Sequence, residues 1–366
     1  MTDARTNLPY METLNPEQKE AVEHSAGPLL ILAGAGSGKT RVITTKIAYL
    51  IAEKKIPPES ILAVTFTKKA ANEMRSRAIA LDDRACFAEI RTFHSFGAWF
   101  LRRYAAEANL VPSFTVYDDD DAATLVMKAV PSLRRQQAEL AAHKISLAKD
   151  YCLTPDDDLS AVDSTGELSA IYRAYEQRLS ETGNADFGDL IIKPVRVMEE
   201  NLAVREQMRF RFRVIMVDEY QDSNVAQFKL LQTLSGTAEG SGTYVCVVGD
   251  DDQSIYRFRG AEVQNILTFR KKFPGTKIIK LVRNYRSTGK ILAAADAVVK
   301  NNEDRIGKTL KAERGAGKAP VLVYLPDQDA EARFCAELIE KAHAEKKTPY
   351  GDWAILYRTN AQSLGF

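Results

Sequence analysis

The residues with the clearest chemistry form a short loop that joins an apolar run to an amphipathic segment. The run 29–32 is continuously apolar, and the amphipathic segment begins at Arg41. Glycines in such a loop let backbone N–H groups approach phosphate oxygens, and the following helix directs its positive end toward them. Lys39 supplies charge for the outer phosphates, and the Thr40 hydroxyl suits Mg²⁺. The expected phosphate cradle comprises Ala33 (where the strict pattern has glycine), Gly34, Ala35, Gly36, Ser37, Gly38, Lys39 and Thr40. A nucleoside-triphosphate site is predicted; the alternative is a glycine-rich turn without a ligand.

Two carboxylates follow a second apolar run at 214–217. Asp218 and Glu219 stand where a parallel sheet presents its ligands, at the carboxyl end of a strand. Asp218 is predicted to bind Mg²⁺, and Glu219 to orient and deprotonate the attacking water. Capping of a turn is the simpler alternative.

A third run, 244–248, leads to Gln253 through three consecutive aspartates at 250–252. A glutamine at a strand end can sense whether the γ-phosphate is still attached. A solvated turn is the alternative for the aspartates, for at least one of the three.

These motifs require a sheet to bring them together. Helical segments such as 41–53 and 69–80 separate the apolar runs, which is typical of an α/β domain with parallel strands buried on both faces. The segment 99–208 reads instead as helices, with acidic clusters at 118–121 and 156–158 that favour helix capping over metal binding. The expected strands are 29–32, 61–66, 214–217, 244–248, 278–281, 321–324 and 354–357, with a further helix at 330–344.

Length and composition set broad limits. A chain of 366 residues is expected to form two or three domains. Fifty basic and forty-nine acidic residues leave a net charge of +1, so any nucleic-acid surface must be a local patch. The four scattered cysteines, the polar start of the chain and the lack of a long apolar run predict a cytoplasmic protein without a membrane segment.

Seven segments in this order resemble the motif set of superfamily 1 DNA helicases of the Rep/UvrD/PcrA group. They are 14–18, 33–40, 65–71, 92–95, 217–224, 249–261 and 284–287. The segment 99–208, including 186–190, is most similar to Rep. Gly188 departs from the acidic residue expected there.

The resemblance implies a RecA-like P-loop NTPase domain with an all-helical insertion, followed by an incomplete second RecA-like domain. The implied boundaries are 1–98 and 209–280 for the first motor domain, 99–208 for the insertion and 281–366 for the start of the second. Because later helicase motifs do not occur, the chain is expected to be a truncated motor with weak ATPase activity.

The resemblance also implies roles around ATP and Mg²⁺. Gln18 is expected to read the adenine edge, and Arg41 and Tyr285 to sandwich the base. Arg286 is expected to reach the γ-phosphate, which gives the catalytic set Lys39, Asp218, Glu219, Gln253 and Arg286.

Aromatic side chains interleaved with basic or hydroxyl residues are typical of single-strand binding. Together with the resemblance, they predict DNA contacts from Phe66, Thr67, Lys68, His94, Tyr256, Phe258, Arg259 and Asn360. Relatives commonly have tryptophan at the position of Phe258. The run 209–213 is compatible with a basic DNA stripe or with a polar lead-in to the next strand.

The implied activity is ATP-dependent 3′–5′ translocation on single-stranded DNA, with 3′-tailed duplexes and replication or repair proteins as partners. A non-motor ATP-binding module that regulates a partner is the alternative function. Base-stacking residues favour the motor.

Overall fold

The computed structural model describes residues 8–236, 242–254, 264–302 and 305–366. The chain divides into two compact units, Met1–Gly317 and Lys318–Phe366. No helix in the described ranges has the length and apolar content needed to cross a membrane.

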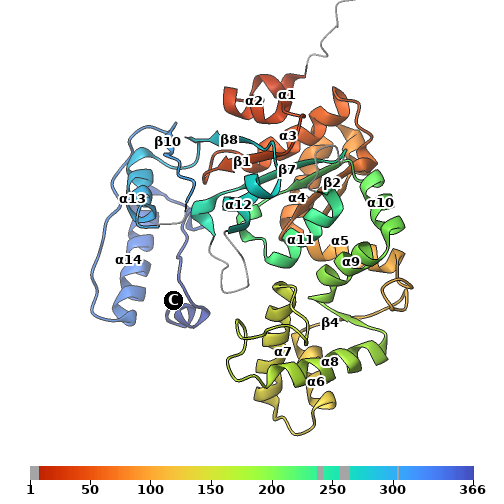
Figure 1. Cartoon of the computed structure of the whole chain (residues 1–366). Coiled ribbons are helices and arrows are strands. Elements are labelled where there is room, and N and C mark those ends of the chain that lie inside the picture. Colours follow the sequence, from red (N-terminus) through yellow and green to blue (C-terminus); the bar gives the residue numbers. More distant parts are fainter. Residues whose placement is uncertain (1–7, 237–241, 255–263, 303–304) are drawn as a thin grey trace, which may run out of the picture. The chain divides into compact units, whose positions relative to one another are not determined.

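A six-stranded parallel sheet forms the centre of the first unit (Figure 1). Its strand order is β3-β2-β6-β7-β1-β8. The strands are β1 (Leu29–Ala33), β2 (Ile61–Thr65), β3 (Glu89–Thr92), β6 (Val214–Val217), β7 (Tyr244–Gly249) and β8 (Lys277–Leu281). Because all of them run in one direction, the phosphate loop and the carboxylates of the predicted site leave the sheet at the same edge.

Alternate residues of β1, β2, β6 and β7 enter different cores, so these strands are buried on both faces as predicted, whereas β3 and β8 at the sheet edges also carry partly or fully exposed residues. In β1, Leu29 and Ile31 pack with α2 (Pro16–Glu23), α3 (Lys39–Ala52) and α4 (Lys68–Leu81). Leu30 and Leu32 face the opposite core. That core is built with α5 (Phe93–Arg103), α9 (Asp189–Glu200), α10 (Leu202–Arg211), α11 (Val225–Ser235) and α12 (Gln264–Lys272).

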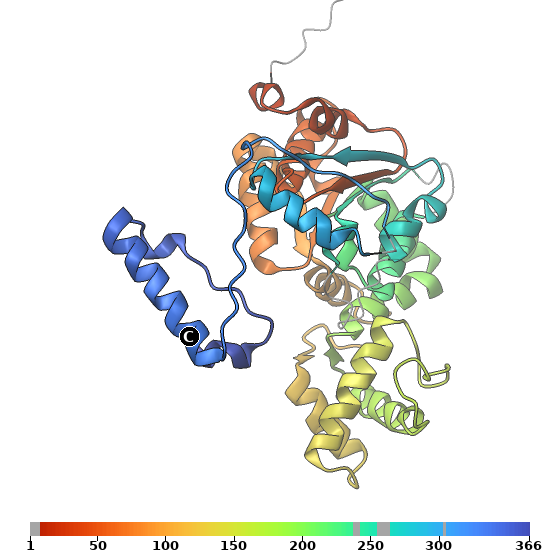
Figure 2. The ribbon, with the colours of Figure 1, turned by 90° about the vertical axis from the view of Figure 1, so that its left-hand side faces the viewer.

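Within 99–208, three helices form a separate hydrophobic core of their own. They are α6 (Asp119–Ala129), α7 (Arg135–Asp150) and α8 (Leu168–Thr182), which lie against one another (Figure 2). Ile145 and Tyr172 are among the residues of this core. The segment is not free of strands as expected, because β4 (Val116–Tyr117) pairs in parallel with β5 (Ala185–Asp186).

The two acidic clusters of this segment differ. Asp118 caps α6 by accepting hydrogen bonds from the backbone N–H groups of Asp120 and Asp121, as predicted. The cluster 156–158 does not cap a helix, because α8 begins only at Leu168. Its carboxylates instead hold local turns, with Asp157 accepting from the Thr154 N–H and Asp158 from the Ser160 N–H.

Two short strands and a helix complete the described part of the first unit. The strands are β9 (Arg283–Asn284) and β10 (Lys311–Ala312), which pair in parallel, and the helix is α13 (Gly289–Val299). A short helix, α1 (Pro9–Glu12), precedes α2.

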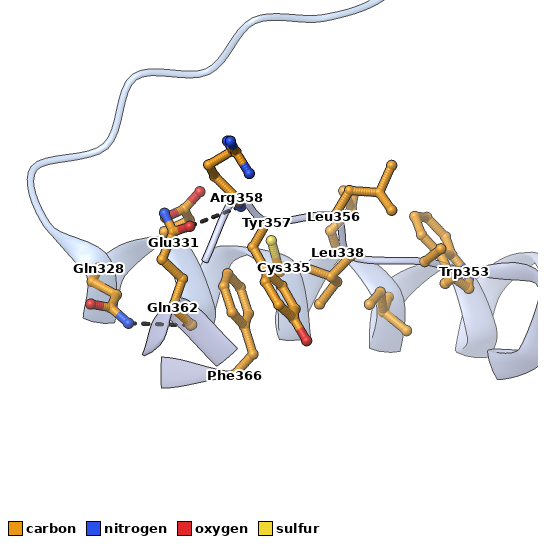
Figure 3. Close-up of a pocket in the computed structure, with 13 residues that line it drawn as sticks. Gln328, Glu331, Cys335, Leu338, Trp353, Leu356, Tyr357, Arg358, Gln362 and Phe366 are labelled. Atoms are coloured by element: carbon orange, nitrogen blue, oxygen red, sulfur yellow. Dashed lines mark hydrogen bonds between the residues drawn. The ribbon is translucent and has the colours of Figure 1, made fainter. Parts of the chain in front are cut away.

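The second unit contains α14 (Gln328–Lys346), close to its predicted range, but neither predicted strand. Residues 321–324 and 354–357 are irregular, and Val321 and Tyr324 are 85% and 87% exposed. A strand needs a neighbour for its N–H and C=O groups, and the second unit offers none. The segment around Trp353 and Tyr357 lines a hollow of about 510 Å³ beside α14 (Figure 3).

Candidate nucleotide site and adjoining cavity

The loop after β1 has the backbone of a phosphate cradle. Gly36 and Gly38 adopt positive φ angles of 67° and 91°, and Gly38 is the N-cap of α3. Side chains rarely tolerate these angles, so glycine is required at both positions. Ser37 closes the loop, because its hydroxyl donates to the Gly34 carbonyl at 2.7 Å. The helix therefore begins at Lys39, with Thr40 in its first turn.

Three carboxylates gather at the end of β6 opposite Lys39. The Lys39 Nζ lies 3.0 Å from Glu219 Oε2. Burial, reinforced by the charge of Glu219, raises the pKa of Asp218 to about 7. Burial likewise raises the pKa of Asp222 to about 6. Glu219 has a positive φ of 50°, an uncommon conformation that is concentrated at functional sites.

This group suits a hard divalent cation. One lysine faces Asp218, Glu219 and Asp222, and among the described residues Asp222 Oδ1 is buried without a hydrogen-bond partner. Oxygen-rich, negatively charged sites are those that Mg²⁺ prefers. The predicted ligands Thr40 and Asp218 follow β1 and β6 at this edge.

Gln18 and its neighbours lie against the same loop. The buried Gln18 amide donates to the Ser37 carbonyl at 2.9 Å and accepts from the Asn15 N–H at 3.1 Å. Asn15 also donates to the Tyr285 hydroxyl at 2.9 Å, and Arg41 donates to the Thr13 hydroxyl at 2.6 Å. The predicted adenine residues Gln18, Arg41 and Tyr285 are thus held around the start of α2.

The segment after β9 folds directly onto the phosphate loop. Asn284 is fully buried, donates to the Ala35 carbonyl and accepts from the N–H groups of Arg286 and Ser287 at 3.0 and 2.7 Å. A Cβ added at Gly36 would lie 2.5 Å from the Arg286 Cβ. The predicted γ-phosphate residue Arg286 therefore lies beside the loop.

Gln221 connects Glu219 to the strand end that carries Gln253. Its Nε2 donates to Glu219 Oε2 at 2.9 Å, and its Oε1 accepts from the Asp250 N–H at 2.9 Å. Gln253 in turn donates to the Asp250 carboxylate. Gln221, Asn15 and Asn284 were missed as site residues, although each lies within a recognised motif.

The three aspartates at 250–252 do not form a solvated turn. The Lys308 Nζ lies 2.6 Å from Asp250 and Asp251 and 2.7 Å from Asp252, and the Lys308 side chain is only 2% exposed. Arg305 adds an ion pair with Asp252 at 2.9 Å. Lys308 and Arg305 therefore balance most of the negative charge of these three aspartates.

A cavity of about 600 Å³ adjoins the nucleotide residues at this edge of the sheet. Its lining includes Glu219 and Gln253 together with three predicted DNA residues, Phe66, Thr67 and His94. Burial lowers the pKa of His94, which favours its neutral form. Phe187, half exposed and 5.8 Å from the His94 ring, also lines the cavity and was missed by sequence reasoning.

Five further residues were predicted to contact DNA. Lys68 begins α4 but does not line the cavity. Tyr256, Phe258 and Arg259 lie outside the described residues. Asn360 belongs to the second unit.

The run 209–213 is a lead-in to β6 rather than part of this edge. Arg209 donates to the Thr233 carbonyl, and Arg211 pairs with Glu89 at 3.3 Å and stacks on Trp99. These arginines precede the amino end of β6, away from the phosphate loop.

The presence of glycine at position 188, where an acidic residue was expected, is explained by the buried side chain of Lys149. A Cβ at Gly188 would lie 2.8 Å from the Lys149 Cβ, so a larger residue would displace α7. Lys149 is fully buried and pairs with Asp186, Asp189 and Glu176 at 2.6, 2.8 and 2.6 Å. The carboxylates of Glu176, Asp186 and Asp189 are therefore paired with a lysine of the chain itself.

Asp150 also lines the cavity, and its environment predicts how the stability of the fold depends on pH. Its carboxylate accepts from the Asn224 amide at 2.6 Å, and burial, with the nearby Asp186, raises its pKa to about 7. Between about pH 4 and pH 7 the folded protein retains a proton that the unfolded chain releases, so stability falls as pH rises through this window. Asp150→Asn should remove this loss and be more stable than the unmodified chain at about pH 8, by on the order of 1–4 kcal/mol.

Urea unfolding of both proteins at about pH 4 and pH 8 measures this difference. The exposed Asp156→Asn variant is the control and should show no pH-dependent gain. A difference between Asp150→Asn and the unmodified chain that is the same at both pH values would contradict the assignment.

Comparison with known proteins agrees with this geometry. The UvrD/REP helicase N-terminal domain matches residues 14–274, and the UvrD-like helicase C-terminal domain matches residues 279–366. The chain is 40% identical to "ATP-dependent DNA helicase UvrD1" of Mycobacterium bovis, covering 99% of this chain and 49% of the relative. It is 40% identical to "ATP-dependent DNA helicase PcrA" of Staphylococcus epidermidis, covering 96% and 49%.

A third relative, "DNA helicase II" of Rickettsia typhi, is 41% identical, with 100% of this chain and 56% of the relative covered. The chain spans about half the length of these curated relatives. The predicted group is confirmed: the chain belongs to the UvrD/REP helicase family.

Proposed function

We propose that this chain forms the nucleotide-binding part of an ATP-dependent DNA helicase that moves along single-stranded DNA. The observation that carries the proposal is the shared cavity: Glu219 and Gln253 line it together with Phe66, His94 and Phe187. Residues suited to hydrolysis and residues suited to base stacking therefore meet at one edge of the sheet. A regulatory module would have no need for such a junction.

ATP would be held by the loop between β1 and α3, with its outer phosphates near Lys39 and its base near Gln18, Arg41 and Tyr285. Mg²⁺, held by Thr40 and Asp218, would neutralise phosphate charge when bound. Arg286 would add a second cation, because the developing charge on the transferred phosphoryl group needs a clamp from both sides.

Glu219 would accept a proton from the attacking water. In the structure its carboxylate is shared between Lys39 and Gln221, and Gln221 reaches the Asp250 N–H. Loss of the γ-phosphate would change the hydrogen bonds of Glu219, Gln221 and Gln253. Because Glu219, Gln221 and Gln253 also line the cavity, this change would alter the affinity for DNA.

We infer the finer properties from the family resemblance. They comprise 3′–5′ movement, action on 3′-tailed duplexes, a cytoplasmic replication or repair role with partner proteins, and DNA contacts from Lys68, Tyr256, Phe258, Arg259 and Asn360. The proposed domains are 1–98 with 209–280, 99–208, and 281–366.

Fluorescence anisotropy with labelled oligo-dT and a blunt duplex of equal length tests the proposal. The chain is expected to prefer the single strand, because stacking on aromatic side chains requires unpaired bases. Equal affinity for both DNAs would contradict single-strand binding at the cavity.

Phe187→Ala should weaken oligo-dT binding by about tenfold, because stacking on one base contributes about 1–3 kcal/mol. Phe187 is half exposed, so the substitution should leave the fold intact. Phe210→Ala is the matched control, since Phe210 is 85% exposed and lies on α10, outside the cavity lining. Equal losses in both variants would remove the cavity from the DNA path.

A further inference from the structure

A buried lysine joins the helix that binds phosphate to the helix that carries Gln18. Lys46 lies on α3 and is completely buried. Its Nζ donates to the Ala21 carbonyl at 2.9 Å, to the Val22 carbonyl at 3.2 Å and to the His24 carbonyl. All three acceptors lie at the carboxyl end of α2.

The carbonyl groups at the carboxyl end of α2 need hydrogen-bond donors, and Lys46 supplies them. The last carbonyls of a helix have no partner within the helix, and burial without a partner is costly. Ala21 and Val22 are fully buried, and His24, the C-cap, has an extended backbone instead of a left-handed glycine cap. Lys46 therefore replaces the usual C-terminal cap.

Tyr244 of β7 supports the same contact. Its hydroxyl donates to the His24 carbonyl at 3.1 Å, and the Lys46 Nζ lies 5.0 Å from its ring centroid. Burial lowers the pKa of Lys46 to about 8, so the ammonium group is charged at neutral pH. The carboxyl end of α2 is thus hydrogen-bonded to α3 through Lys46 and to β7 of the sheet through Tyr244.

The helical geometry extends this contact to the nucleotide. Lys46 follows Lys39 by about two turns of α3 and so lies on the same face. Gln18 lies about one turn before Ala21 and Val22 in α2. Lys46 therefore connects α3, the helix that follows the phosphate loop, to the carboxyl end of α2, the helix that carries Gln18.

Gln18 has capacity left to read a base. Its amide uses one N–H on Ser37 and one oxygen lone pair on Asn15. A primary amide has two donors and two acceptor sites, so one of each is not used by the residues that the structure describes. One donor beside one acceptor matches the N7 acceptor and the N6–H₂ donor of adenine, whereas guanine presents two acceptors, N7 and O6, at the same positions.

We propose that Lys46 is a positioning residue for nucleobase selectivity: by fixing the end of α2 to α3, it holds Gln18 where its amide discriminates adenine from guanine. The inference rests on the proposed role of Gln18 in ATP binding. Lys46 itself does not touch the nucleotide.

The test compares dissociation constants for ATP, GTP and inorganic tripolyphosphate, each with Mg²⁺, by calorimetry. Lys46→Met keeps an unbranched side chain that is one atom shorter and loses the hydrogen-bond donors. It should weaken ATP binding by about tenfold while GTP and tripolyphosphate change by less than about twofold, because only the base contact is misplaced. Lys46→Arg keeps donors and charge and should restore the ATP preference. A thermal-unfolding scan checks that each variant is folded.

Tyr244→Phe is a milder variant that removes the hydroxyl group, and with it the bond to the His24 carbonyl and the contact with the Cys246 thiol. It should reduce the ATP preference in the same direction by a smaller factor, and it keeps the inference testable if Lys46→Met does not fold. An unchanged ATP-to-GTP ratio in the folded variants, or equal losses for ATP and tripolyphosphate, would overturn the inference.

Gln18→Ala separates this inference from the proposed function. If Gln18→Ala abolishes the ATP preference and the Lys46 and Tyr244 variants do not, the positioning role alone is wrong. If Gln18→Ala leaves the ATP preference intact, the adenine role of Gln18 is wrong and the inference is overturned with it.

Discussion

Lys39→Ala is expected to abolish measurable ATP binding, which corresponds to a loss of about a hundredfold or more. A charge-assisted hydrogen bond to a phosphate contributes up to about 3 kcal/mol, and each 1.4 kcal/mol is about tenfold in affinity. The loss is large here because Lys39 is the cation opposite Asp218, Glu219 and Asp222. Without it, three carboxylates face the triphosphate directly. Calorimetry with ATP and Mg²⁺ measures the effect.

Lys341→Ala is the matched control, because the Lys341 side chain is 70% exposed on α14 in the second unit. It should bind ATP as the unmodified chain does. Unchanged affinity in Lys39→Ala would refute the phosphate cradle.

Glu219→Gln is expected to retain ATP binding but to lower the hydrolysis rate by about 10²- to 10⁴-fold, the usual contribution of a general base. The amide keeps the shape of the side chain but cannot accept the proton. Since Glu219 is paired with Lys39 at 3.0 Å, its neutralisation releases the ammonium group for phosphate, and ATP affinity should be equal or higher. Single-turnover hydrolysis in the presence of oligo-dT, with parallel binding measurements, separates the two effects.

The control is Glu206→Gln, an exposed glutamate on α10 that pairs with Arg209 at 3.3 Å. Its hydrolysis and binding should be unchanged. Hydrolysis by Glu219→Gln at the rate of the unmodified chain would exclude Glu219 as the base.

Much of this site could be predicted because its residues are adjacent in sequence. The loop from Gly34 to Thr40 needs positive φ angles at Gly36 and Gly38, and those glycines are visible in the chain. Asp218 directly follows one apolar strand, and Gln253 lies a few residues after another. The carboxyl ends of parallel strands meet at one edge of the sheet. The apolar runs and the motifs at their carboxyl ends therefore predicted which motifs would meet.

The residues that connect those motifs could not be predicted in the same way. Asn284 reaches Ala35 across 249 positions, and Asn15 reaches Tyr285 across 270. Phe187 enters the cavity from 186–190, a segment that the sequence analysis linked to Rep without assigning it a DNA contact. Such contacts depend on how distant segments fold together, and one sequence carries no direct signal of that pairing.

The predicted strands at 321–324 and 354–357 fail for a related reason. Both are apolar and rich in β-branched and aromatic residues, so local propensity favours strands. Propensity alone does not supply the hydrogen-bonding neighbour that a strand requires. In the second unit both segments are irregular, and 354–357 lines the hollow beside α14.

The central claim is that the nucleotide site is coupled to the adjoining cavity, where DNA is proposed to bind. The most direct test measures the affinity for oligo-dT with and without a non-hydrolysable ATP analogue and Mg²⁺. Coupling between two sites of about 1–3 kcal/mol would change the dissociation constant by about 5- to 150-fold. The account predicts such a change in the unmodified chain and none in Lys39→Ala. Identical oligo-dT affinities in the unmodified chain, under conditions where the analogue is bound, would contradict it.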